Sequence, residues 1–183
     1  MKYKALLFGS IGTLIESSDI QRTSFNEAFK DAGLDWYWDE QDYRNLLKKS
    51  GGTKRVEDFA EKNNVNVNAS QIRNRKTEIF SSYIIKNKQK LRKSVYEIIN
   101  FSKKNNIKLS LSTSTTTNNV EAVFKSLSDQ IVKQDFDFIG NKSLVKYEKP
   151  HPEIYKVTLE HLNIEASDCI AIEDTEESSQ SAI

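Results

Sequence analysis

The chain has 183 residues, enough for one domain or for a core with a small insert. Its 27 basic and 26 acidic residues nearly cancel, so charge gives no reason to expect nucleic acid or an anionic membrane as a partner. The single cysteine, Cys169, excludes an internal disulfide and lies in an apolar run, where we expect a buried thiol. This cysteine usage favours a reducing compartment, most simply the cytoplasm. No stretch of the sequence reaches the roughly 20 apolar residues of a membrane span.

The first predicted element is a buried strand at Ala5–Phe8, which breaks into a turn containing Gly9 and Gly12. Residues 18–90 then contain no convincing strand, and their pattern indicates an all-helical second domain. Thr53 is a candidate cap for its third helix. The predicted helices of this insert are Gln21–Ala32, Glu40–Lys49, Lys54–Asn63 and Ser70–Lys86.

After the insert, predicted strands alternate with predicted helices. The strands are Ile107–Leu111 and Cys169–Ile172, with Phe136–Ile139 as a plausible addition, and the helices are Val95–Lys104, Asn119–Leu127 and Pro152–Leu162. This alternation predicts an α/β fold with a Rossmann-like parallel sheet and one inserted α-helical domain. Reactive groups gather at the carboxyl ends of the strands in such sheets.

Polar and charged residues lie near those strand ends. Thr113 follows a hydroxyl-rich strand end, Lys149 precedes the helix predicted to begin at Pro152, and Glu173 with Asp174 closes the last strand. Each feature alone has an ordinary structural explanation, such as a turn, an exposed surface position or the charge at a helix start. In this order and at these spacings, however, the features together form a highly specific sequence pattern.

Together with the turn at residues 9–14, these segments resemble the haloacid dehalogenase (HAD) superfamily of hydrolases and, within it, the CbbY-like phosphatases of sugar phosphates. The resemblance covers essentially the whole chain, because residues 25–29, 32–39 and 51–52 look like the helical cap of that subfamily. It implies a discontinuous core at residues 1–17 and 91–183 and a cap at residues 18–90. It also implies further elements after Asp174, so a chain ending at Ile183 is expected to have a core that is incomplete at its C-terminus.

The resemblance implies a role for each matching residue. Thr113 would be the phosphate-binding hydroxyl and Lys149 the phosphate-binding cation, and both are candidate catalytic residues. Glu173 and Asp174 would be the carboxylates that bind Mg²⁺, which offsets negative charge on the substrate. Arg55 follows a Gly-Gly pair, as in the cap of the subfamily, and would contact a substrate phosphate.

The first motif departs from the family at two positions. The family has Asp-x-Asp-Gly-Thr-Leu there, whereas this chain has Gly9 and Ile11 in place of the two aspartates. In the family the first aspartate attacks phosphorus, and the second protonates the leaving alcohol and later activates water. Gly9 cannot form the covalent intermediate and Ile11 cannot move a proton. We therefore expect impaired or absent catalysis and weakened Mg²⁺ binding.

The resemblance implies a Mg²⁺-dependent phosphatase of small sugar phosphates, of the type that acts on xylulose 1,5-bisphosphate, with impaired or no catalysis in this chain. The alternative is a non-catalytic pseudo-hydrolase that binds a phosphorylated metabolite or a protein. We expect a small phosphorylated metabolite as ligand, no nucleic-acid or membrane partner, and a monomer. The expected location is the cytoplasm, with a plastid as the second option.

Overall fold

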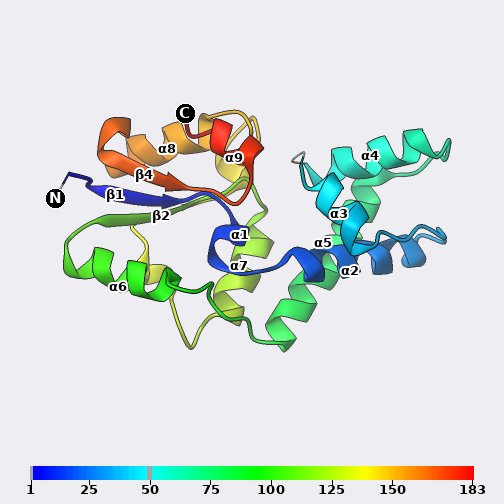
Figure 1. Cartoon of the computed structure of the whole chain (residues 1–183), viewed down its shortest axis with the longest axis horizontal. Coiled ribbons are helices and arrows are strands. Elements are labelled where there is room, and N and C mark those ends of the chain that lie inside the picture. The colour runs from blue at the N-terminus through cyan, green and yellow to red at the C-terminus, as the bar shows by residue number, and fades with distance from the viewer. Residues whose placement is uncertain (1, 49–50) are drawn as a thin grey trace.

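Parallel strands form the central sheet of the computed structural model, which describes residues 2–48 and 51–183. In their order across the sheet they are β3 (Phe138–Gly140), β2 (Lys108–Ser112), β1 (Ala5–Phe8) and β4 (Cys169–Ile172). β1 pairs in parallel with β2 on one side and with β4 on the other (Figure 1). The predicted α/β fold with a parallel sheet is confirmed.

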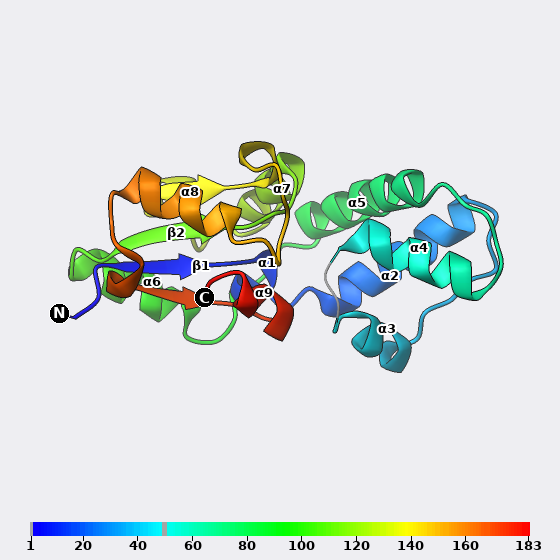
Figure 2. The same ribbon diagram turned by 90° about the horizontal axis from the view of Figure 1, so that it is seen from above.

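Helices cover both faces of the sheet, because side chains of β1 alternate between the two faces (Figures 1 and 2). Leu7 packs against α8 (Glu153–Leu162). Phe8 packs on the opposite face with α6 (Val95–Lys104) and α7 (Thr117–Ser126). The shorter elements of this three-layer core are α1 (Ile11–Leu14), α9 (Glu176–Gln180) and the 3-10 turns η1 (Lys133–Asp135), η2 (Lys142–Leu144) and η3 (Ala166–Asp168).

Helices α2 to α5 form a separate unit beside the sheet, which we call the cap, with no strand among the described residues between 18 and 90 (Figure 2). They are α2 (Ser18–Asp31), α3 (Glu40–Leu46), α4 (Gly52–Lys62) and α5 (Ala69–Lys86). Phe25 and Phe29 pack against Trp38, which is fully buried in the cap. α5 also contacts α7, so the cap faces the carboxyl ends of the strands. The division of the chain at residues 18 and 90 stays a prediction.

Two predicted details of the cap helices are wrong. Thr53 does not cap α4, because Gly51 takes that place with φ of +91°, a conformation that glycine adopts readily. The helix therefore starts at Gly52 and contains Thr53. α3 ends at Leu46, before the predicted end at Lys49, which lies outside the described residues.

The predicted burial of Cys169 is also wrong. β4 lies at the edge of the sheet and has a neighbouring strand on one side only. Its side chains are half-buried or exposed: Cys169 is half-buried and Ile170 is 40% exposed. An apolar run alone does not distinguish an edge strand from a central one.

Candidate active site

The turn after β1 places both altered motif positions at the carboxyl end of the central strand. Gly9 donates its N–H to the carbonyl oxygen of Ile172 in β4, 2.9 Å away. Ser10 caps α1, because its hydroxyl accepts the N–H of Thr13 at 3.2 Å. Ile11 is 6% exposed and packs into the core cluster of α6 and α7. Ile11 also lines the cavity between the strand ends and the cap, so position 11 presents an apolar side chain there.

Lys149, Glu173 and Tyr155 form a buried polar cluster beside Gly9. Nζ of Lys149 donates to the carbonyl oxygen of Gly9 at 2.5 Å and forms an ion pair with Oε1 of Glu173. The hydroxyl of Tyr155 donates to the same Oε1 at 2.7 Å. The side chains of Lys149 and Glu173 are 6% and 2% exposed. The ammonium of Lys149 thus points inward, and Glu173 balances its charge.

This cluster occupies the space that a side chain at position 9 would need. A Cβ on Gly9 would lie closer than 3.0 Å to Oε1 of Glu173 and to the hydroxyl of Tyr155, a separation that real Cβ atoms essentially never show. The carboxylate of Asp174 lies in the same way against Gly12. Glu173 and Tyr155 therefore close the site where the family has its nucleophile.

Burial governs protonation in the cluster. It lowers the pKa of Lys149, while the charges of Glu173 and Asp174 act in the opposite direction. Burial also raises the pKa of Tyr155, and the charge of Glu173 adds to this effect. The Tyr155 hydroxyl is therefore a hydrogen-bond donor at physiological pH.

A cavity of about 210 Å³ lies between the carboxyl ends of the strands, which we call the sheet edge, and the cap. Thr113 and Asp174 line it from the core, and Arg55 lines it from the cap. Lys149 and Glu173 are not among the described residues that line it; they lie in the polar cluster beside Gly9. The structure thus brings three of the five predicted site residues to one cavity. The roles of all five stay predictions.

Positive side chains line the cap side of this cavity. Arg55 comes from α4, and Arg73 and Lys76 come from α5. Nε of Arg55 donates to the carbonyl oxygen of Leu46 at 3.0 Å, and burial lowers the pKa of the guanidinium. The lining is therefore suited to an anionic ligand group.

Lys76 is the most buried of these cations, with 6% exposure. Its ammonium donates to the side-chain oxygen of Gln21 and lies 5.1 Å and 4.9 Å from the ring centres of Phe25 and Phe80. Burial and the charges of Arg73 and Arg55 lower the pKa of Lys76 to about 7. Near neutral pH, a bound anion would favour its protonated form.

The sequence analysis did not single out Lys76 or Arg73. For Lys76 a signal exists, because Ile72, Lys76 and Phe80 are spaced by four residues and form the buried stripe of α5. A lysine within an apolar stripe is unusual and indicates a special environment. Arg73 is followed by the polar residues Asn74 and Arg75, so the sequence around it gives no comparable signal.

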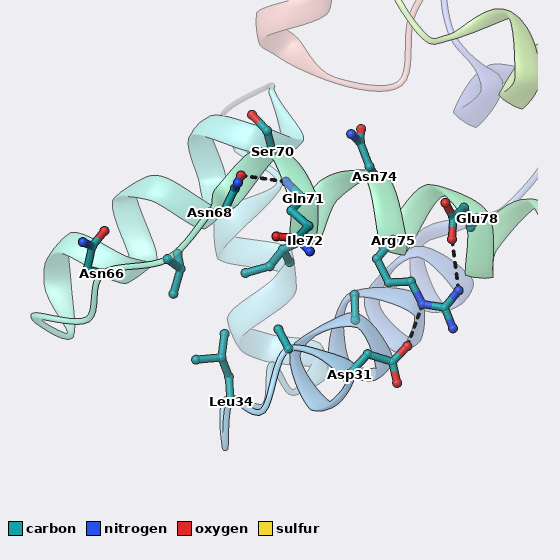
Figure 3. A pocket seen from close by; sticks show the side chains of 13 residues that line it. Asp31, Leu34, Asn66, Asn68, Ser70, Gln71, Ile72, Asn74, Arg75 and Glu78 are labelled. Carbon is teal, nitrogen blue, oxygen red and sulfur yellow. Dashed lines mark hydrogen bonds and ion pairs between the residues drawn. The ribbon is translucent and has the colours of Figure 1, made fainter.

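A larger pocket of about 860 Å³ lies on the outer side of the cap, between α2 and α5 (Figure 3). Arg75 there forms ion pairs with Asp31 at 2.6 Å and with Glu78 at 3.0 Å. None of the described residues that line this pocket is a predicted site residue. Although this pocket is larger, its lining lacks the predicted site residues. The cavity at the sheet edge is therefore the better candidate for the active site.

Glu173 and Asp174 fit the magnesium role as a minimal carboxylate pair. Oε2 of Glu173 is buried without a hydrogen-bond partner among the described residues, so this oxygen is available to a cation. Asp174 is exposed and adds a second carboxylate. No group of three or more His, Cys, Asp or Glu side chains in the described parts of the chain is placed to hold a metal. Magnesium is often held by one or two carboxylates together with water and substrate phosphate, and the pair fits that arrangement.

The sequence matches known proteins along nearly its whole length. The family of haloacid dehalogenase-like hydrolases matches residues 3–182. Protein CbbY of Cereibacter sphaeroides is 32% identical over 175 residues, which cover 94% of this chain and 76% of that protein. Protein CbbY of Rhodobacter capsulatus is 32% identical over 178 residues, which cover 96% of this chain and 78% of that protein.

Solved structures share the fold. CbbY from Rhodobacter sphaeroides in complex with phosphate has a TM-score of 0.87 and 31% identity, covering 98% of this chain and 81% of that chain. A mutant CbbY from the same organism, in complex with xylulose 1,5-bisphosphate, has a TM-score of 0.86 and 30% identity over the same shares. The match of the family along residues 3–182 and the identity to CbbY show that this chain belongs to the haloacid dehalogenase-like hydrolases.

Proposed function

We propose that the chain is a Mg²⁺-dependent sugar-phosphate phosphatase of the CbbY type whose hydrolysis is strongly impaired. The cavity at the sheet edge carries this proposal, because it joins Thr113 and Asp174 to three cationic side chains of the cap. A phosphate ester supplies the negative charge and the acceptor oxygens that such a lining can bind. The complex of a CbbY mutant with a sugar bisphosphate supports this choice of ligand.

The residues around the cavity have separate tasks in this proposal. The hydroxyl of Thr113 binds a phosphoryl oxygen. Lys149 binds phosphate in this proposal only when its ammonium is released from the ion pair with Glu173. Glu173 and Asp174 would hold Mg²⁺, which neutralises phosphoryl charge when it is bound. Gly9 supplies no nucleophile. Loss of a catalytic nucleophile can lower turnover by on the order of a millionfold, so we expect hydrolysis near background.

A small phosphorylated ligand fits the chain better than a macromolecule. A cavity of about 210 Å³ has the size of a site for a small metabolite. The alternative of a protein partner is not favoured, since the CbbY structures contain phosphate or a sugar bisphosphate. In the described parts of the chain, no helix has both the length and the apolar character to cross a bilayer. We further propose that the chain acts as a monomer in the cytoplasm.

A panel of sugar mono- and bisphosphates, with Mg²⁺ or with a chelator, tests the proposal. Calorimetry measures binding, and a phosphate-release assay measures hydrolysis. We expect clear binding of at least one sugar phosphate and phosphate release near background. A chain that binds no member of the panel under either condition contradicts the proposed ligand class. Rapid Mg²⁺-dependent phosphate release contradicts the proposed loss of catalysis.

A further inference from the structure

Hydrogen bonds connect the cap to the turn that carries Thr113. The hydroxyl of Ser81 in α5 donates to Oδ1 of Asn119 in α7 at 3.2 Å. Nδ2 of Asn119 donates to the hydroxyl oxygen of Thr115 at 2.9 Å. The backbone N–H of Thr115 donates to the hydroxyl oxygen of Thr113 at 3.2 Å. The side chain of Asn119 is thus bonded to the cap on one side and to this turn of the core on the other.

Asn119 is held through both its backbone and its side chain. Its N–H donates to the hydroxyl of Thr116, the N-cap of α7, at 3.4 Å. The residue is 6% exposed, so losing a hydrogen bond of its amide has a high free-energy cost. Its amide oxygen accepts from Ser81 and its amide nitrogen donates to Thr115. Although Asn119 lines the cavity, its amide therefore acts mainly on neighbouring protein groups.

Ser81 lies on the face of α5 that is turned toward the core. Thr77, one turn earlier in α5, lines the cavity, and residues four apart lie on the same face of a helix. Ser81 itself is half-buried and is not among the described residues that line the cavity. Its hydrogen bond to Asn119 fixes how this face of α5 is turned against α7. The bond therefore helps to place the cap side of the cavity.

The hydroxyl of Thr113 is arranged to donate. Its oxygen accepts the N–H of Thr115, so its own proton remains for a phosphoryl oxygen. Thr113 is 4% exposed and lines the cavity. The position of Thr115 depends in turn on the amide of Asn119. A shift of Asn119 would thus move the hydroxyl that the proposed function assigns to phosphate.

We propose that Asn119 is a positioning residue that couples the cap to phosphate binding at Thr113. The inference rests on the proposed function, because it takes Thr113 as the phosphate-binding hydroxyl. With both side-chain hydrogen bonds of Asn119 in place, the cap and the turn hold the arrangement that binds phosphate. Without them this arrangement is one of several, and the apparent affinity falls with its population. By reciprocity, phosphate bound at Thr113 should stabilise the contact between α5 and α7.

Calorimetric titration of the full chain with inorganic phosphate, in the presence of Mg²⁺, tests this role. Ser81→Ala should weaken phosphate binding by about threefold to tenfold, although Ser81 does not line the cavity. Asn119→Ala should weaken it at least as much. The double variant should bind no more weakly than Asn119→Ala alone, because both changes break the same connection. The matched control Ser82→Ala, at the exposed neighbouring position of α5, should bind phosphate as the unmodified chain does.

Hydrogen exchange separates positioning from a role in stability alone. Phosphate should slow the exchange of α5 amides around Ser81 in the unmodified chain, and this slowing should be lost in Ser81→Ala and Asn119→Ala below their melting temperatures. A residue that only stabilises the fold would lower the melting temperature and leave the slowing intact.

Three results would overturn the role of Asn119 and leave the proposed function standing. They are phosphate binding by Ser81→Ala as tight as by Ser82→Ala, additive losses of affinity in the double variant, and phosphate-dependent slowing that persists in Asn119→Ala. If the unmodified chain binds neither inorganic phosphate nor a sugar phosphate, the proposed function fails and this inference fails with it.

Discussion

Restoring carboxylates at positions 9 and 11 tests whether Glu173 and Tyr155 can move out of the space beside position 9. In the double variant Gly9→Asp/Ile11→Asp, the new Cβ at position 9 would overlap Oε1 of Glu173 and the hydroxyl of Tyr155. Glu173 must then leave its ion pair with Lys149. The new aspartate can replace it as the partner of the ammonium. Recovery of turnover therefore requires a rearrangement of the buried cluster as well as two new side chains.

The rearrangement destabilises the fold by an amount that can be bounded. Overpacking a filled site costs about 1–3 kcal/mol, which we expect for Gly9→Asp. Ile11 is 6% exposed in the main core cluster, and truncating such an isoleucine costs about 2–5 kcal/mol. The cations of the cavity offset part of the charge that Ile11→Asp adds. The total of about 3–8 kcal/mol is large against the roughly 5–15 kcal/mol that stabilises a typical protein.

Urea denaturation and Mg²⁺-dependent phosphate release, measured on the same preparations, separate stability from chemistry. Gly9→Ala is the matched control, because it introduces the overlap without a carboxylate. We expect Gly9→Ala to lose at least as much stability as Gly9→Asp, because alanine cannot replace Glu173 as the partner of Lys149. The double variant should exceed the unmodified chain in turnover at temperatures where it stays folded. Gly9→Asp alone should recover less, since a general acid contributes about 10²–10⁴-fold.

Two results would refute this reasoning. If Gly9→Ala unfolds at the same urea concentration as the unmodified chain, Glu173 and Tyr155 do not fill the space beside position 9. If the unmodified chain shows robust Mg²⁺-dependent turnover, a group other than a residue at position 9 attacks phosphorus.

Lys149→Met should lower the free energy of unfolding by about 3–5 kcal/mol in urea titrations, because it leaves Glu173 buried without its cation. Adding Glu173→Gln should restore part of the loss, and a further loss contradicts the charge-pair explanation. The pKa of Lys76 falls from 10.5 to about 7 on folding, so the unmodified chain should gain stability as pH rises between these values. Lys76→Met should therefore stabilise the chain most below about pH 7, and a stability difference that does not change with pH contradicts this. Affinity of the unmodified chain for sugar phosphates should fall above about pH 7 as Lys76 loses its proton, and calorimetry in two buffers should show proton uptake on binding.

Local sequence signals were sufficient for most of the fold. β1 and β4 have their predicted bounds, because each is a short apolar run that ends in small or polar residues. The exposure of β4 was not predictable in this way, since it depends on which strands pair across the sheet. The start of α4 was missed because it depends on the positive φ of Gly51, and Thr53 offered a more familiar capping residue.

The candidate site was predictable only where it follows the family motifs. Thr113 follows β2 and Asp174 follows β4, the two parallel strands that flank β1, so the fold class alone predicts that both lie at the same edge of the sheet. The closure beside Gly9 carries no local signal, because Tyr155 comes from α8 and Glu173 follows β4. Only the three-dimensional packing shows that these side chains take the space of the absent nucleophile.

Phosphate binding and hydrolysis depend on different residues in this site, and the replacements at positions 9 and 11 affect them in opposite directions. Thr113 and the cap cations are independent of position 9, whereas the two missing aspartates would have added negative charge in the cavity lining at position 11 and in the adjoining Lys149 cluster at position 9. Their absence leaves the cavity more positive, which strengthens its attraction for phosphate. The double variant Gly9→Asp/Ile11→Asp should therefore bind inorganic phosphate about tenfold more weakly than the unmodified chain in calorimetry without Mg²⁺, even where its turnover rises. Equal or tighter phosphate binding by the folded double variant contradicts this separation of the two functions.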